Sequence, residues 1–214
     1  MIGAQAASYG AVVILLIASV AVSIVLPQAT WSFALLIALE AGAVIVAISR
    51  SRARALVWPL MALFAALAVG LTLLPQRSSH GVANLVSALI LLSLPAVIVM
   101  RFRRDLYVTV ESVFGAISIY LVIGLLYAAL DSSVGAIGGQ PFFAGTADAT
   151  SSQYTYFSFV TLCTVGYGDL VPASGLARGL AVSEAVIGQL YLVTVIALVV
   201  GNLGRERQAS RVRQ

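Results

Sequence analysis

Six consecutive residues carry the most specific chemical pattern of the sequence: Thr164-Val165-Gly166-Tyr167-Gly168-Asp169. Two glycines one residue apart permit backbone angles that place successive carbonyl oxygens on the same side of the chain. Four such strands around an axis would form stacked rings of oxygens, able to replace the hydration shell of a bare cation. The pattern therefore predicts that the backbone of this segment coordinates a cation.

The segment before this motif is expected to position it. Between two long apolar stretches lie residues 131–176, of which 131–152 are rich in Gly, Ala, Ser and Thr and predict an exposed outer loop. Residues 154–163 are mostly aromatic or apolar, too few to span a membrane but enough for a re-entrant half-helix. Candidate N-caps for this half-helix are Asp148, Ser151 and Ser152. Its C-terminal dipole would add negative potential at the glycine motif.

The composition requires a membrane around these elements. Of the 214 residues, 61% are hydrophobic and only 9% are charged, which excludes a water-soluble globular protein. A single cysteine, Cys163, excludes an internal disulfide, and a single histidine, His80, leaves no Cys/His cluster for zinc. Every basic residue is arginine, so no lysine is present for a phosphate-binding loop.

Six apolar stretches are long enough to cross the hydrocarbon core. They lie at about 8–26, 32–49, 56–74, 82–100, 110–130 and 177–201. Ten of the twelve basic residues follow the second, fourth and sixth stretches, and only Arg77 and Arg178 fall on the other side. The positive-inside rule then places both termini in the cytoplasm. We expect a multi-pass protein of the plasma membrane, and the compact chain fits a bacterial inner membrane.

Thr164 to Gly168 resembles the signature filter of potassium channels, and Asp169 matches the acidic residue that follows it in that family. The resemblance covers about 110–203, an outer helix, a pore loop and an inner helix. It implies that Thr164 binds K+ through its hydroxyl and carbonyl oxygens. It further implies that Val165, Gly166 and Tyr167 bind K+ through carbonyl oxygens, with Gly168 completing the filter.

The same resemblance assigns supporting roles. An aromatic cuff behind the filter would fall on Tyr156, Phe157 and Tyr167, with Asp169 at the end of the filter. The glycine that serves as a gating hinge in the inner helix of simpler members would be Gly188, 19 residues after Asp169.

Glu184 is a further candidate for filter support. Many potassium channels place a carboxyl group behind the filter from the pore helix, but Val160 occupies the matching position here. We hypothesise that Glu184 takes this role from the sixth span by hydrogen-bonding the backbone of the pore helix or filter. The alternative is that Glu184 pairs with Arg178.

These elements predict an all-α membrane protein of six transmembrane helices, with a re-entrant pore helix and selectivity filter between spans 5 and 6. Residues 1–104 would form a four-helix domain, 105–203 the pore domain and 204–214 a short basic cytoplasmic tail. A voltage sensor needs arginines at every third position of span 4, and 82–100 contains no basic residue, so voltage gating is not expected. One pore loop per chain requires a homotetramer in the bilayer.

The expected function is passive, selective K+ permeation, with K+ as permeant ion and no organic cofactor, organic substrate or nucleic acid. A non-conducting or regulatory membrane subunit and a poorly selective cation channel remain alternatives. Residues 166–169 also match the Gly-x-Gly-Asp motif of intramembrane aspartyl proteases, which need a second intramembrane aspartate. None of the four aspartates follows a tyrosine and none is expected inside a span, so no enzyme is expected.

Overall fold

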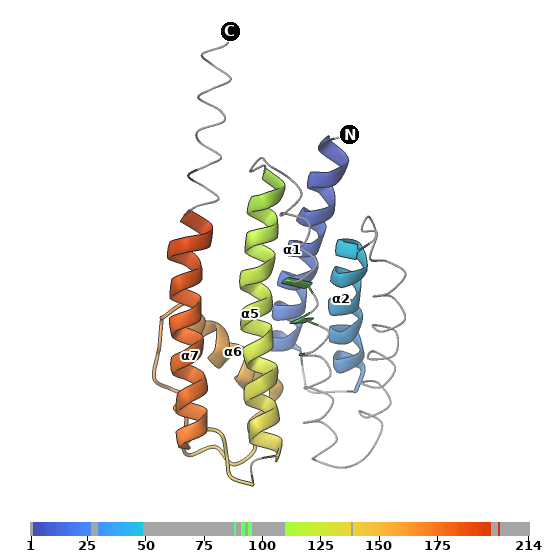
Figure 1. Ribbon diagram of the computed structural model, residues 1–214. Coiled ribbons are helices and arrows are strands. Elements are labelled where there is room, and N and C mark those ends of the chain that lie inside the picture. The colour runs from blue at the N-terminus through green and yellow to red at the C-terminus, as the bar shows by residue number, and fades with distance from the viewer. Residues whose placement is uncertain are drawn as a thin grey trace.

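The structure is a computed structural model that describes residues 2–26, 30–48, 88, 91–92, 94–95, 110–137, 139–197 and 201. Within these ranges all regular elements are helical. They are α1 (Ile2–Val25), α2 (Thr30–Ile48), α5 (Val110–Ile137), α6 (Ser151–Leu162), α7 (Gly175–Tyr191) and a π-helix η1 (Leu192–Ile196). Four long helices run side by side, and the short α6 lies among them near one end (Figure 1). The all-α prediction holds for the described part of the chain.

Two described helices are long and apolar enough to cross a membrane, Ser112–Ile137 and Gly175–Ile196. Shorter apolar helices cover Tyr9–Val25 and Leu35–Ala47. The predicted spans at 56–74 and 82–100 lie outside the described residues, apart from five helical positions in the latter. The six-span count and the cytoplasmic position of the termini therefore stay predictions.

The core lies where α1, α2 and α5 meet. Val12 and Leu16 of α1 pack with Val44 of α2 and with Val122 and Leu125 of α5. Helix α5 also packs against α6 and α7, and it stands between α7 and α1 (Figure 1). Helix α5 therefore packs against both the N-terminal helices and the helices that follow it.

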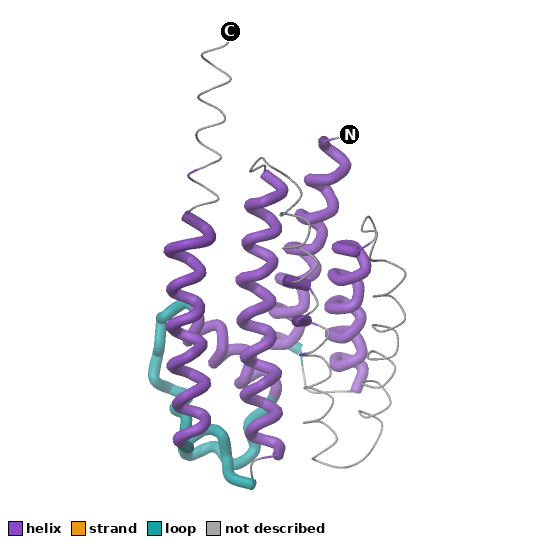
Figure 2. Tube along the Cα trace, viewed as in Figure 1, coloured by secondary structure: helices purple, strands orange, loops and turns teal. Residues whose placement is uncertain are grey.

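The predicted start of the outer loop is wrong. Helix α5 continues through Asp131 to Ile137, and Asp131 is fully buried. The serines of this stretch do not end the helix because their hydroxyls can bond to it: Ser133 Oγ donates to the carbonyl oxygen of Ala129 at 2.7 Å. An aspartate therefore does lie inside a candidate span, contrary to expectation. The loop proper follows, joining α5 to α6 at one end of the bundle (Figure 2).

Candidate functional site

Helix α6 begins with a capping box at Thr150. The Thr150 side chain accepts from the backbone N–H of Gln153, while the Gln153 side chain accepts from the backbone N–H of Thr150 at 2.8 Å. The predicted N-caps Asp148, Ser151 and Ser152 are therefore wrong. The overlooked signal is the spacing Thr-x-x-Gln, in which two otherwise unpaired backbone donors are satisfied reciprocally.

The glycine motif is attached to the end of α6 through its N–H groups. Cys163 N–H donates to Phe159 O at 3.0 Å, and Thr164 N–H donates to Thr161 O at 2.9 Å. Val165 N–H donates to Val160 O at 2.9 Å. Because the N–H groups at the start of the motif, up to Gly166, bond back to the helix, the carbonyl oxygens there are the groups available to a ligand.

The backbone of this segment alternates in handedness. Thr164, Gly166 and Gly168 have φ of 56°, 57° and 80°, and Thr164 is the only non-glycine residue of the described chain with positive φ. An ordinary strand points successive carbonyl groups to opposite sides, whereas alternation of left- and right-handed angles brings them to one side. Positive φ is rare for a β-branched residue and costs about 1–3 kcal/mol, and such strain concentrates at functional sites.

All side chains from Cys163 to Asp169 are exposed in the single chain. They include Val165, 51% exposed, and Tyr167, 71% exposed. Two exposed apolar side chains beside a strained backbone indicate a surface that another component covers.

The structure brings two of the three predicted cuff aromatics together. The rings of Tyr156 and Tyr167 stack with centroids 6.4 Å apart and planes 5° apart. The hydrogen bond between Tyr156 and the Asp169 carboxylate raises the pKa of the Tyr156 hydroxyl and ties α6 to the far end of the motif. Phe157 instead packs against Phe143, with ring centroids 5.0 Å apart.

Phe142 and Phe143 were not predicted to matter. They form a buried cluster with Tyr154 and Phe157, and their loop pairs with the segment after the glycine motif. Ala144 N–H donates to Val171 O and Ala173 N–H donates to Phe142 O, both at 2.8 Å. An adjacent pair of phenylalanines within a loop of small residues was the available signal.

Glu184 is fully buried and contacts α6. Its Oε1 lies 2.5 Å from Ser158 Oγ, so the contact involves a side-chain hydroxyl and not the backbone group we expected. Arg178 does not pair with it: Arg178 is exposed, and its Nε donates to Pro172 O at 3.3 Å.

Gly188 is buried against the last residue of α6. A Cβ at this position would lie 2.7 Å from both the carbonyl oxygen and Cδ1 of Leu162, so close packing alone requires glycine here. The π-helix η1 begins four residues later. The hinge role of Gly188 stays a prediction.

Helix α1 also contacts α6, which the sequence did not suggest. Ser23 Oγ lies 2.7 Å from Thr155 Oγ1 in a buried hydrogen bond. Ser152 Oγ donates to Ile24 O at 3.1 Å. The first helix of the chain therefore holds the helix that carries the glycine motif.

Residues 115–204 match the family model described as "Ion channel". This range contains most of α5, the whole of α6 with the glycine motif, and α7 with η1. This description agrees with the two helices of the range that are apolar and long enough to cross a membrane.

Two curated rice proteins (Oryza sativa subsp. japonica) are similar to the chain. Two pore potassium channel c is 40% identical over 70 residues, which cover 32% of this chain and 14% of the relative. Two pore potassium channel b is 33% identical over 92 residues, which cover 42% of this chain and 24% of the relative. The chain thus spans less than a quarter of either relative. No solved structure matches it.

Proposed function

We propose that the chain is a subunit of a potassium-selective channel that conducts K+ passively down its electrochemical gradient. The carbonyl oxygens of Val165, Gly166 and Tyr167, with the hydroxyl and carbonyl of Thr164, bind the dehydrated ion. Gly168 completes the filter, which Asp169, Tyr156 and Phe157 support. The alternating backbone of 164–168, joined to α6 by its N–H groups, is the observation that carries this proposal. The printed names of the two rice relatives agree with it.

The proposed channel is a homotetramer in the bilayer. One chain supplies one filter strand, whereas a ring of oxygens around an ion needs several. The exposed side chains of 163–169 are those that further copies would cover. Residues 1–104 form a four-helix N-terminal domain, both termini face the cytoplasm, and the lack of arginines in 82–100 argues against voltage gating.

The test measures K+ flux from proteoliposomes that are loaded with KCl and diluted into NaCl. A fluorescent dye detects the protons that enter the liposomes as K+ leaves. The informative variants are Gly166→Ala and Gly145→Ala. Both glycines have positive φ, 57° and 79°, and both have open space around the added Cβ. The local strain is therefore matched at about 1–2 kcal/mol, and only the first change falls in the filter.

We expect barium-sensitive K+ flux from the unmodified protein and from Gly145→Ala, and loss of that flux in Gly166→Ala. Equal fluxes of K+ and Na+ would instead indicate a poorly selective cation channel. Absence of flux from a folded, assembled protein would indicate a non-conducting subunit. Either of these results contradicts the proposal.

A further inference from the structure

Two carboxyl groups lie buried behind the proposed filter. Asp131 on α5 and Glu184 on α7 are both fully buried, and they interact electrostatically. Neither oxygen of Asp131 has a hydrogen-bond partner among the described residues, and the same is true of Glu184 Oε2. In the described ranges the one basic residue is Arg178, which is exposed and bonded to Pro172. Two unpaired carboxylates in such a site would repel each other strongly, because burial removes the screening by water.

Ser158 of α6 contacts both Gly124 of α5 and Glu184 of α7. Ser158 Oγ lies 2.6 Å from Gly124 O and 2.5 Å from Glu184 Oε1. A serine hydroxyl has one proton to donate, and a backbone carbonyl oxygen can only accept. With Glu184 ionised, Ser158 would have to share its single proton between Glu184 Oε1 and Gly124 O. With Glu184 as a carboxylic acid, Glu184 donates to Ser158 Oγ and Ser158 donates fully to Gly124 O, and the burial of both acids without a basic partner among the described residues favours this second arrangement. This chain of two bonds joins α7 to α6 and α6 to α5.

We propose that Asp131 and Glu184 form a proton-binding pair that positions the filter, with the proton on Glu184 and Asp131 controlling its release. This inference rests on the proposed channel function. When the proton leaves, Glu184 and Gly124 O compete for the single hydroxyl proton of Ser158, and the connection between α7 and α6 weakens. Gly188, one turn after Glu184, packs against Leu162 at the end of α6, next to the filter. Conduction should therefore fall as the pH rises.

The other ionisable groups described at this junction are tyrosines and the Cys163 thiol, which lies 3.6 Å from the Tyr120 hydroxyl. On α5, Tyr120 interacts electrostatically with Glu184, and the Tyr127 hydroxyl lies 3.0 Å from Ser183 Oγ of α7. Tyr154 of α6 is buried, and η1 has no ionisable side chain.

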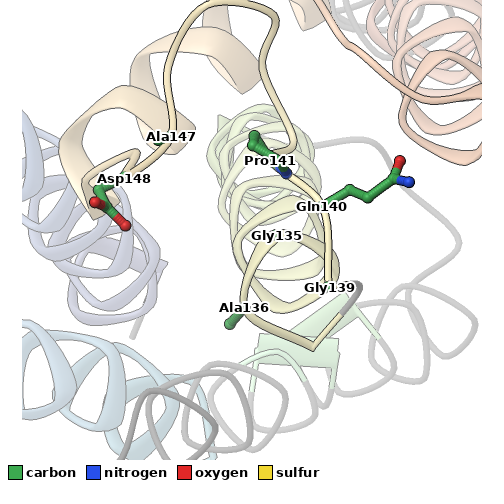
Figure 3. Close-up of a pocket in the computed structure, with 7 residues that line it drawn as sticks. All are labelled: Gly135, Ala136, Gly139, Gln140, Pro141, Ala147 and Asp148. Carbon is green, nitrogen blue, oxygen red and sulfur yellow. The ribbon is translucent and has the colours of Figure 1, made fainter.

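An outer pocket brings solvent close to the pair. A pocket of about 320 Å³ lies beside the end of α5, with Gly135 and Ala136 on the helix and Asp148 on the loop (Figure 3). Gly135 follows Asp131 by one helical turn, so the two lie on the same face, about 6 Å apart. The Tyr154 hydroxyl occupies the space that a side chain at Gly135 would need. The pair is therefore expected to respond to the pH of the loop side.

The experiment measures single-channel or liposome flux while the pH on the loop side is varied and that on the other side is fixed. Glu184→Gln can still donate an N–H to Ser158 but has no proton to lose, so flux should persist without the alkaline decline. Asp131→Asn removes a neighbouring negative charge, so the decline should move to lower pH by about one unit. Asp148→Asn, an acid that lines the pocket outside the pair, should leave the profile unchanged.

A readout independent of conduction separates this inference from the channel proposal. Infrared difference spectra of the purified protein should show the band of a protonated carboxyl group that disappears at high pH and is absent in Glu184→Gln. If the unmodified protein conducts nothing but shows this band, the channel proposal fails and the proton site stands. If Glu184→Gln keeps both the band and the unmodified pH profile, the proton is not on Glu184 and the inference is wrong.

Discussion

Helices α5 and α7 are both apolar and long enough to cross a membrane, α7 together with η1, but their surroundings differ. From Ser112 to Ala136 of α5 no side chain is fully exposed, because α1, α6 and α7 surround it. In the most apolar 18-residue window of each helix, 44% of α5 is buried, against 11% of α7 with η1. The difference shows that one chain covers much of α5 but leaves most of α7 to lipid or to other copies.

The buried and the exposed residues of α7 lie on opposite faces of the helix. The face toward α5 and α6 carries its four buried residues, Ala177, Glu184, Gly188 and Tyr191. The opposite face carries Val182, Val186 and Leu190, which are spaced by four residues and are all exposed. Lipid could cover this stripe but not the polar backbone of the neighbouring filter segment. Further copies of the chain could cover both.

The largest expected effect comes from placing a bulky side chain on the exposed stripe. Val186→Trp should abolish the tetramer if that face packs against another copy, because an interface between helices cannot admit the added volume. Ile14→Trp is the control, since Ile14 of α1 is 67% exposed and a tryptophan facing lipid is tolerated. Size-exclusion chromatography with light scattering in mild detergent measures the assembly. A tetramer that survives Val186→Trp would mean that lipid covers this face.

An effect of intermediate size is expected from substitutions on the buried face of α7. Gly188→Ala forces a methyl group against Leu162 O and should destabilise the protein by about 1–3 kcal/mol. Gly179→Ala, on the same helix with open space around it, should be neutral or stabilising by up to about 1 kcal/mol. Unfolding in detergent, followed by circular dichroism, measures both. Equal stabilities of the two variants would show that Gly188 is present for flexibility alone.

The smallest effect concerns the contact between α1 and α6. A double-mutant cycle of Ser23→Ala and Thr155→Val should give a coupling of about 0.6 kcal/mol in the free energy of unfolding, typical of a hydrogen bond between membrane helices. Ser19→Ala provides the control because the buried Ser19 hydroxyl has no hydrogen-bond partner among the described residues. Its coupling to Thr155 should be zero. A coupling near zero for Ser23 as well would leave α6 supported by α5 and α7 alone.

Local patterns predicted the elements around the filter but not their long-range contacts. The glycine spacing of 164–168 and the short aromatic run before it are local, so they predicted both the motif and the helix that carries it. The bond from Ser23 to Thr155 joins residues 132 positions apart, and nothing in either neighbourhood marks them as partners. Ser158 was missed for the same reason. Asp131 was misplaced because composition suggests a loop, whereas packing against α6 favours about two more turns of helix.

The π-helix η1 affects how the sequence of α7 and η1 is aligned with the inner helices of other proteins. Thr194 Oγ1 donates to Leu190 O within this wide turn, which takes up about one residue more than an α-helical turn. At about 100° per residue, the described residues after the wide turn, Ala197 and Gly201, are rotated by that angle relative to a continuous α-helix. An inner helix that lacks the wide turn therefore aligns with this one only if a one-residue gap is placed between 192 and 196. Without the gap, residues that line a pore in one protein would be equated with residues that face away from it in the other.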